Sequence, residues 1–280
     1  MSSALLREGN TNCGGCGMSI GLRWLDEVFA EQRPYLVIPA ACAIVTAGAF
    51  PTSSYGVPAL ASTFASAPAY ATGVSAVAEL NGEQHPTVCW AGDGGTYDIG
   101  MATLSAAAER NEDMLYVCYD NEIYGNTGGQ RSSATPAGAV TSTTPGGKLE
   151  AKKDILAIMA AHRIPYAATL SIAHRHDFLR KLTIAREMRG FRFLLMLSPC
   201  PTGWKASSDE SVSLIELAVR SGLFPLYEVF NGTDYVINAR PDGTDVAEYL
   251  VHQRRYNAVE VGTVRERIAA QWQYLDRMAR

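Results

Sequence analysis

The sequence predicts an α/β fold, a parallel sheet with helices on both faces. Short apolar runs rich in β-forming residues alternate along the chain with longer amphipathic runs. This strand–helix–strand alternation is typical of parallel sheets. Two of the apolar runs are followed directly by polar residues, at the position where ligands bind in parallel sheets. The 280 residues, of which 47% are hydrophobic and 19% charged, are enough to build one large core.

Each predicted element follows from its own pattern. The predicted strands are short, continuous apolar runs, at 35–39, 87–91, 114–119, 166–171 and 193–197. The predicted helices have apolar residues three and four positions apart, at 18–31, 61–80, 101–110, 153–161 and 175–188. Beyond position 199 the pattern predicts a helix at 211–221, a hairpin of 226–230 with 235–238, and a final helix at 264–278. No repeat or linker divides the chain, so we expect one domain over residues 1–280 with a less regular C-terminal extension from about residue 200.

Composition excludes several classes of function. The net charge is −4 and no basic run is present, which argues against nucleic acid as a partner. The alanine-rich stretch 59–80 is interrupted by Pro68 and Gly73, so we expect no membrane span. The N-terminus lacks the pattern of a signal peptide. We therefore expect a cytoplasmic protein, in which cysteines indicate metal or redox chemistry before disulfides.

A candidate magnesium site follows two neighbouring predicted strands. Asp93 lies among Gly92, Gly94 and Gly95 in what the sequence predicts to be a glycine turn, and Asn121 follows the next strand 28 positions later. Carboxylate and amide oxygens are ligands that Mg²⁺ prefers, and the ion commonly bridges one or two side chains to phosphate oxygens. Glycines let the backbone come close to phosphates. The layout predicts a magnesium ion held against a diphosphate, with a backbone carbonyl nearby as a further ligand.

Four cysteines form a candidate metal or cluster site. Cys13 and Cys16 make a Cys-x-x-Cys loop before a predicted helix, while Cys42 and Cys200 follow strand ends at the same edge as Asp93. From spacing alone, both a [4Fe-4S] cluster and zinc fit such a set. Two further cysteines lie inside predicted strands and are expected to be small buried side chains, Cys89 and Cys118.

The run Asp120-Asn-Glu-Ile-Tyr-Gly-Asn-Thr-Gly-Gly-Gln130, preceded by the Gly-Asp-Gly at 92–94, resembles the thiamine diphosphate motif. More narrowly, it resembles the thiamine diphosphate-binding β subunit of the 2-oxoacid:ferredoxin oxidoreductases, of the pyruvate:ferredoxin oxidoreductase type. The resemblance covers nearly the whole chain and implies a thiamine diphosphate-binding fold. It includes an N-terminal Cys-x-x-Cys, a third cysteine, and a late Ser-Pro-Cys. Cys13, Cys16, Cys42 and Cys200 match these positions, so the resemblance favours the [4Fe-4S] cluster.

The resemblance also implies roles for the residues around the diphosphate. Asp93 and Asn121 are expected to bind Mg²⁺ through their side chains, and Ile123 through its carbonyl. Gly92, Gly94 and Gly95 are expected to pass close to the diphosphate.

The polar loop over 126–148 follows the motif and is longer than a simple connection. By the resemblance, Asn126 lies beside the thiazolium and the substrate, where it is the expected catalytic residue; the alternative is that it caps the loop. Thr127 and Gln130 are expected to shape the loop around the cofactor. Arg131 either contacts a carboxylate or phosphate or lies free on the loop surface.

The activity implied is oxidative decarboxylation of a 2-oxoacid to an acyl-CoA and CO₂, with thiamine diphosphate, Mg²⁺ and a [4Fe-4S] cluster as cofactors. The expected partners are an α subunit that completes the thiamine site and a ferredoxin-like subunit with further clusters. One alternative is a non-oxidative thiamine diphosphate decarboxylase or synthase subunit, which lacks the four cysteines. Another is a zinc-stabilised scaffold subunit that has lost thiamine chemistry, an interpretation that requires Asp93 or Asn121 to be missing, whereas both are present.

Two stretches depart from the pattern of pyruvate-type members. Residues 64–69 read Phe-Ala-Ser-Ala-Pro-Ala, where those members carry an acidic or amide residue, and residues 46–55 also differ. Small side chains leave room, so we expect either a pyruvate-type substrate or a bulkier 2-oxoacid, such as an aromatic one of the phenylglyoxylate kind.

Overall fold

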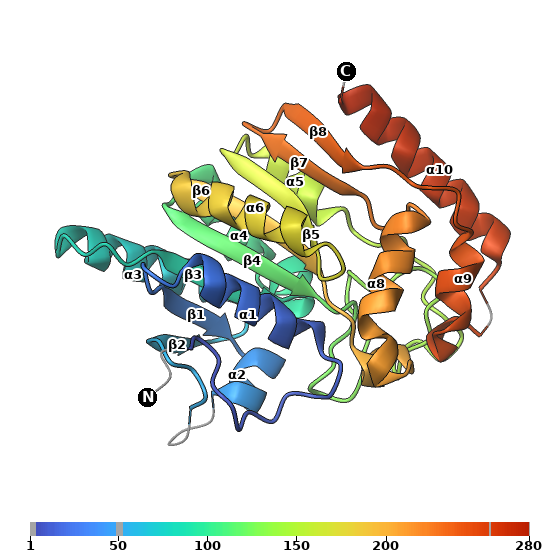
Figure 1. The fold of residues 1–280 in the computed structure, drawn as a ribbon, viewed down its shortest axis with the longest axis horizontal. Coiled ribbons are helices and arrows are strands. Elements are labelled where there is room, and N and C mark those ends of the chain that lie inside the picture. Colours follow the sequence, from blue (N-terminus) through green and yellow to red (C-terminus); the bar gives the residue numbers. More distant parts are fainter. Residues whose placement is uncertain (1–3, 49–52, 258, 280) are drawn as a thin grey trace.

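A computed structural model describes residues 4–48, 53–257 and 259–279 of the chain. Its centre is one sheet with the strand order β2-β1-β3-β4-β6-β5-β7-β8 (Figure 1). The neighbouring strands from β2 to β5 pair in parallel, and β7 and β8 pair antiparallel. The strands are β1 Tyr35–Pro39, β2 Ala59–Ser62, β3 Thr87–Gly92, β4 Met114–Asp120, β5 Tyr166–Ser171, β6 Phe191–Leu197, β7 Leu226–Phe230 and β8 Asp234–Ala239.

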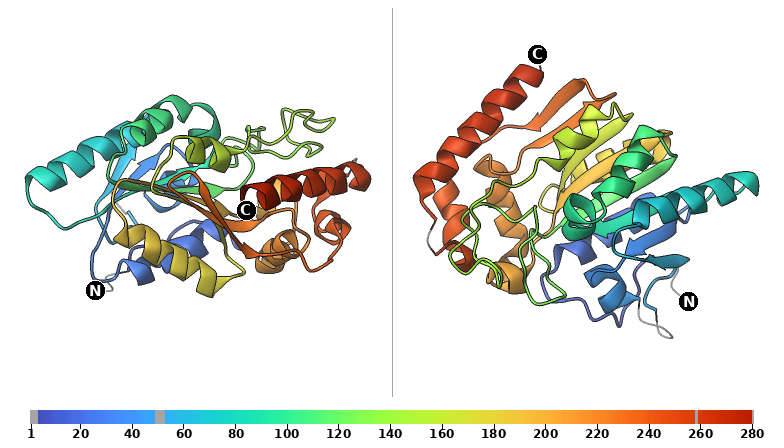
Figure 2. Two further views of the ribbon diagram at one scale, coloured as in Figure 1. Left: turned by 90° about the horizontal axis from the view of Figure 1, so that it is seen from above. Right: turned by 180° about the vertical axis from the view of Figure 1, so that it is seen from behind.

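Helices cover both faces of the sheet, as Figure 2 shows. One face carries α1 (Gly17–Val28) and α6 (Arg175–Glu187), and the other carries α3 (Ala67–Leu80), α4 (Met101–Glu109) and α5 (Ile155–Ala161). At the β7–β8 end lie α8 (Ser211–Arg220), α9 (Val246–Val251) and α10 (Val261–Met278). Two short helices begin beside the carboxyl ends of strands, α2 (Cys42–Ala47) and α7 (Pro201–Trp204). The predicted α/β class is therefore confirmed.

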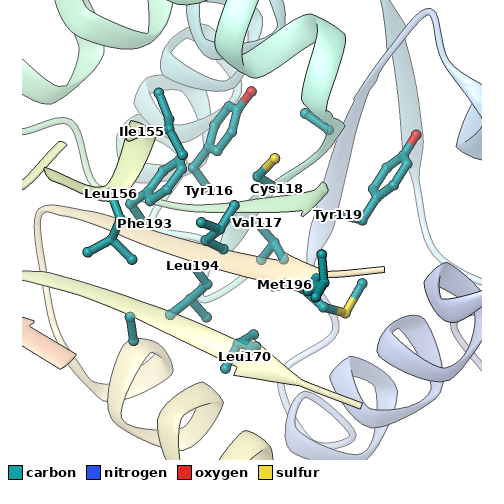
Figure 3. Packing of buried hydrophobic residues seen from close by; sticks show 14 of the residues in the cluster. Tyr116, Val117, Cys118, Tyr119, Ile155, Leu156, Leu170, Phe193, Leu194 and Met196 are labelled. Carbon is teal, nitrogen blue, oxygen red and sulfur yellow. The ribbon is translucent and has the colours of Figure 1, made fainter. Parts of the chain in front are cut away.

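The core lies along β4 and β6, which are buried over their full length. Figure 3 shows Tyr116, Phe193 and Leu194 packed between the strands and the helices. The rings of Tyr116 and Phe193 stack with centroids 5.7 Å apart. Cys89 and Cys118 are fully buried in this core, as predicted. Continuous apolar runs produce this arrangement because a parallel strand covered on both faces has no polar side.

The predicted helix over 61–80 is wrong at its start. Ala59–Ser62 forms strand β2, which pairs in parallel with β1, and helix α3 begins only at Ala67. Pro68 occupies the first turn of α3, where a missing backbone N–H costs nothing and the fixed φ favours a helix start. The alanine-rich composition hid the strand, because alanine favours helices.

The C-terminal region extends the same sheet. The predicted hairpin is confirmed: β7 and β8 pair antiparallel around Asn231 and Gly232, and both residues adopt positive φ. This conformation is typical of tight hairpin turns. Helix α9 was not predicted. The predicted departure over 46–55 lies partly outside the described residues, because positions 49–52 are not among them. Among the described residues, no helix is both long and apolar enough to cross a membrane.

The order in which strands are added to the sheet reverses at β1. From β1 the chain passes to β2 on one side and then to β3 on the other. A crevice opens beyond the carboxyl ends of the strands at such a switch point, and ligands of open α/β sheets bind there.

Candidate functional site

Four adjacent strands deliver the predicted site residues to one edge of the sheet. Cys42 follows β1, Asp93 follows β3, Asn121 follows β4, and Cys200 follows β6. The four strands are neighbours in the order β1-β3-β4-β6. Because they run in parallel, their carboxyl ends meet, and the two sites predicted from separate motifs lie side by side.

A cavity of about 300 Å³ opens at this edge. It contains most of the residues expected to bind the diphosphate and magnesium. Its lining includes Gly92, Asp93, Gly94, Gly95, Asn121, Ile123, Asn126 and Thr127. Cys42 also lines it, so one predicted cluster ligand faces the same space as the predicted cofactor site.

The sequence predicts that Asp93 lies in a turn, and this prediction is wrong. It has helical backbone angles and precedes a single π-helical turn, Gly94–Asp98. Such turns are rare and occur often at functional sites. Gly94 is required here, because a side chain at this position would overlap the ring of Tyr124.

Asp93 is a buried carboxylate with little compensation. Its residue is 2% exposed and it accepts a hydrogen bond from the hydroxyl of Ser132. Burial, and then the charge of nearby Asp120, raise the pKa of Asp93 well above its ordinary value. Within the described ranges, Asp93 forms no ion pair with a lysine or arginine.

The other buried charges behind the cavity are paired. Lys152 Nζ lies 2.6 Å from Asp120 Oδ2 and 2.7 Å from Glu122 Oε1. Arg255 Nη2 lies 2.6 Å from the second oxygen of Glu122. Burial raises the pKa of Glu122, but the charges of Lys152 and Arg255 outweigh this effect and the pKa lies below its ordinary value. With two cations against three carboxylates, the carboxylate of Asp93 is left over. A divalent cation fits this excess negative charge, and oxygen ligands suit Mg²⁺.

The backbone around Asn121 is held by contacts on both sides. Asn121 Oδ1 accepts the N–H of Ile123 at 3.2 Å, and the carbonyl of Asn121 accepts Trp204 Nε1–H at 2.8 Å. Glu122 has φ +63°, an uncommon left-handed conformation for a residue with a side chain. These contacts hold Asn121, which lines the same cavity as Asp93.

The loop after the motif is held by hydrogen bonds within the loop itself. Thr127 Oγ1 donates to Gln130 Oε1 at 2.6 Å, and Gln130 Nε2 donates to the carbonyl of Thr127 at 2.8 Å. Gln130 and Arg131 are not among the residues that line the cavity. Gln130 therefore reaches the site through Thr127, and Arg131 lies exposed on the loop.

A buried lysine ties the next part of this loop together. Lys148 is 2% exposed, and its ammonium donates to the carbonyls of Ser133 at 3.2 Å and Thr135 at 2.7 Å. The Thr135 hydroxyl in turn donates to the carbonyl of Glu122 at 2.6 Å. Ser132, which contacts Asp93, lies in this anchored segment.

The cysteines approach one another beside the cavity. A Cβ atom built on Gly125 would lie 3.7 Å from Cys200 Sγ and 3.8 Å from Cys42 Sγ. Cys16 is the residue before α1, and the next N–H, of Gly17, donates to the carbonyl of Pro199 at 3.2 Å. Cys42 lies in the first turn of α2, whereas a loop position is what the sequence predicts.

Burial and mutual repulsion act on these thiols. Burial is the main cause that raises the pKa of Cys16 to about 12 and of Cys42 to about 11, and the neighbouring thiols add to both shifts. Burial also raises the pKa of Cys200, with Cys13 contributing. The four thiols therefore act on one another electrostatically, and metal binding is what would deprotonate them at neutral pH.

Backbone N–H groups point at three of the four sulfur atoms. Met18 donates to Cys16, Asn126 donates to Cys42, and Gly203 donates to Cys200 at 3.4 Å. Such hydrogen bonds are a feature of iron–sulfur ligands, whose reduction potential they tune. Among the described residues, no three His, Cys, Asp or Glu side chains lie at the spacing of a single bound metal ion.

Sequence reasoning missed the residues that support this site from behind. No sequence prediction gave a role to Ser132, Lys152, Trp204 or Arg255, and Arg255 lies 133 positions from its partner Glu122. The only signal in the sequence was the position of Ser132 within the polar loop.

The chain is similar to known thiamine-dependent proteins. Residues 41–196 match the family described as thiamine pyrophosphate enzyme, C-terminal TPP binding domain. The ketoisovalerate oxidoreductase subunit VorB of Pyrococcus furiosus is 41% identical, with 97% of this chain and 92% of that protein covered. The pyruvate synthase subunit PorB of Methanothermobacter marburgensis is 39% identical, with 90% of this chain and 89% of that protein covered.

A solved structure shares the fold. The 2-oxoglutarate:ferredoxin oxidoreductase from Magnetococcus marinus, with 2-oxoglutarate, coenzyme A and succinyl-CoA bound, matches with a TM-score of 0.66. The match covers 97% of this chain and 96% of that chain at 22% identity.

Proposed function

The chain belongs to the thiamine diphosphate-binding β subunits of the 2-oxoacid:ferredoxin oxidoreductases, and from that premise we propose that it carries the catalytic centre of an enzyme that oxidatively decarboxylates an apolar 2-oxoacid. The proposal includes Mg²⁺, a [4Fe-4S] cluster and transfer of the acyl group to coenzyme A. One observation carries it: the buried carboxylate of Asp93 and the thiol of Cys42 line the same cavity, and the thiols of Cys42 and Cys200 both lie close to Gly125.

This chain's residues have distinct tasks at the diphosphate. In the proposal, the side chains of Asp93 and Asn121 and the carbonyl of Ile123 hold Mg²⁺, and the glycines at 92, 94 and 95 pass along the diphosphate. Bound thiamine diphosphate supplies a carbon nucleophile and an electron sink. Asn126 lines the same cavity, where its amide orients the reacting groups; this is the proposed catalytic role.

The proposed cluster ligands are Cys13, Cys16, Cys42 and Cys200. Their support is that the sulfur atoms of Cys42 and Cys200 both lie close to Gly125 of the cofactor motif, within 4 Å of where its Cβ atom would be. A cluster so close to the cavity shortens the path of electrons that leave the substrate. Because free thiols are retained in reducing compartments, the proposed location is the cytoplasm.

The cavity supports an apolar substrate side chain. Its lining includes Ala40, Val45 and Phe64, and Asp93 is the only charged residue among the described lining residues. A second carboxylate, as in 2-oxoglutarate, would find no lysine or arginine among the described residues that line the cavity and would be repelled by Asp93. The relatives named for ketoisovalerate and for pyruvate synthesis agree with this class. We propose branched aliphatic or aromatic 2-oxoacids ahead of pyruvate.

The proposed enzyme is one subunit of a complex. Only the diphosphate half of a thiamine site is recognised in this chain, so a partner α subunit supplies the pyrimidine half. A ferredoxin-like subunit carries the electrons onward. We propose a single domain over residues 1–280, since β7 and β8 continue the same sheet.

The test is co-expression with the neighbouring subunits, purification without oxygen, and measurement of iron, sulfide and thiamine diphosphate for each chain. About four irons attributable to this chain, as a Cys₄-ligated cubane holds, together with bound thiamine diphosphate, is the expected result. Zinc or no metal with thiamine diphosphate still bound would overturn electron transfer and favour a non-oxidative decarboxylase. A substrate screen then compares branched, aromatic and acidic 2-oxoacids. Faster oxidation of 2-oxoglutarate than of the apolar acids would contradict the substrate class.

A further inference from the structure

The charge network behind the magnesium site is closed by a residue from the far end of the chain. The Arg255 side chain is 2% exposed and pairs with Glu122 at 2.6 Å. Its Nε donates to Gln253 Oε1 at 2.9 Å, and its Nη2 donates to the hydroxyl of Tyr249 at 3.3 Å. These partners fix the plane of the guanidinium, so Arg255 holds Glu122 in one position.

Arg255 also contacts the other group that holds Asn121. The guanidinium carbon lies 4.2 Å from the ring centroid of Trp204, a cation–π contact in a desolvated place. Trp204 Nε1–H donates to the carbonyl of Asn121. Arg255 therefore supports Asn121 from two sides, through its chain neighbour Glu122 and through Trp204.

Trp204 belongs to the turn that carries the fourth cysteine. Helix α7 begins directly after Cys200, and the N–H of Gly203 donates to Cys200 Sγ. A Cβ atom built on Gly203 would lie 2.8 Å from Ile123 Cγ2. The Cys200 turn and the cofactor loop thus pack directly against each other, and Arg255 touches both.

The backbone of Glu122 explains why such support is needed. Its φ of +63° is left-handed, a conformation that is unfavourable for a residue with a side chain and persists where neighbours enforce it. Glu122 lies between Asn121 and Ile123, the two proposed magnesium ligands of this loop. If the ion pair were lost, both ligands would be free to shift.

We propose that Arg255 is a positioning residue that couples the cofactor loop, residues 121–123, to the Cys200 turn, so that one buried side chain sets the geometry of both the magnesium–diphosphate site and the cluster site. This inference rests on the proposed function. It assigns Arg255 no contact with the substrate or with the reacting atoms.

The test uses Arg255→Lys in the complete, anaerobically purified complex. Lysine keeps the charge but has no planar fork to bridge Glu122 and stack on Trp204. Thiamine diphosphate is removed by chelation of the metal and dialysis, and its Kd is measured at saturating Mg²⁺. The dithionite-reduced cluster is examined by electron paramagnetic resonance. We expect the Kd to rise about tenfold, as for other residues that orient metal ligands, and the resonance lines of the cluster to shift.

The matched control is Arg254→Met, a change at the exposed neighbouring position, which is expected to alter neither measurement. The second variant is Glu122→Gln, which keeps the side-chain shape and removes the charge that Arg255 holds. If the two residues act as a unit, the Arg255→Lys/Glu122→Gln double variant raises the Kd by less than the product of the single effects.

The outcomes separate the inference from its premise. An unchanged Kd and an unchanged spectrum in Arg255→Lys overturn the inference, and so does a change confined to one of the two centres. A wild-type complex that binds no thiamine diphosphate, or that holds no iron on this chain, overturns the proposed function itself.

Discussion

Two buried charge networks support the same sheet, and they differ in their balance. At the cofactor edge, Asp93, Asp120 and Glu122 face two cations, Lys152 and Arg255. The second network lies beside β5 and β7.

In that second network, two acids meet two cations. Arg180 Nη2 lies 2.6 Å from Glu228 Oε2 and 3.0 Å from Asp177 Oδ1, and Lys181 Nζ lies 2.6 Å from Asp177 Oδ2. Tyr166 also donates to Glu228 at 2.6 Å. The balanced network joins α6 to the sheet and needs nothing further. In the proposed function, a bound cation completes the unbalanced network, which without that cation contains one carboxylate more than it has cations.

The largest expected effect comes from balancing the cofactor network. Asp93→Asn removes the unpaired charge and a proposed magnesium ligand together. We expect thiamine diphosphate binding and activity to fall by at least about 100-fold, more than for residues that only orient ligands. The cofactor-free variant should be more stable than the wild type by about 1 kcal/mol, because a buried unpaired charge is gone.

The measurements are a thiamine diphosphate titration and urea unfolding without metal. Asp98→Asn is the control: Asp98 is a nearby carboxylate that pairs with Tyr124 and Ser133. A less stable cofactor-free Asp93→Asn variant would contradict the proposed imbalance.

Removing Lys152, the cation that Asp120 and Glu122 share, should lower stability, whereas Asp93→Asn should raise it. Lys152→Met removes the lysine that pairs with Asp120 and with one oxygen of Glu122, while Asp120 keeps its hydrogen bond from the hydroxyl of Tyr97. About a quarter of the Lys152 side chain is exposed, so we expect a loss near the low end for a broken buried pair, about 3 kcal/mol in the free energy of unfolding. Urea unfolding checks this, with Lys205→Met, at an exposed lysine, as the control. A loss equal to that of the control would show that Lys152 is dispensable.

Disturbing the balanced network should affect stability alone. Glu228→Gln replaces a carboxylate that Arg180, Tyr166 and Asn238 all contact. Loss of charged hydrogen bonds should lower the free energy of unfolding by about 2 kcal/mol. The Kd of thiamine diphosphate should not change; a weakened Kd would show that the two networks are coupled.

The smallest expected effect is the pH dependence of the stability difference between the wild type and Glu228→Gln. Burial raises the pKa of Glu228, whereas hydrogen bonds from Arg180, Tyr166 and Asn238 lower it by more. The resulting pKa lies below the ordinary 4.5. A depressed carboxyl pKa adds stability that is fully present above the unfolded pKa and is lost as the pH falls through the folded one. The stability gap between wild type and Glu228→Gln should therefore be full at pH 7 and shrink below about pH 4.5. A gap that widens in acid would refute this sign.

The sequence predicted the residues that line the cavity better than the residues that support them from the side away from the cavity. The positions of Asp93, Asn121, Cys42 and Cys200 were predictable because each follows a strand end, and parallel strands bring their carboxyl ends to one edge. The strand boundaries followed from continuous apolar runs.

The back of the site could not be predicted in the same way. Arg255 and Trp204 approach Glu122 and Asn121 only through tertiary packing, which no local pattern records. The start of α3 failed for another reason, because alanine in β2 has a helix propensity that strand pairing overrides.

The buried ammonium of Lys148 has a consequence for how the cofactor is loaded. It binds backbone carbonyls at Ser133 and Thr135, so this part of the long loop is shaped by the chain's own contacts. A ligand that arrives at Asp93 finds the Ser132 hydroxyl already in place. Little chain entropy is then lost on binding, because the ordering took place during folding. We therefore expect thiamine diphosphate to bind to a preformed site, with an association rate that depends little on loop motion.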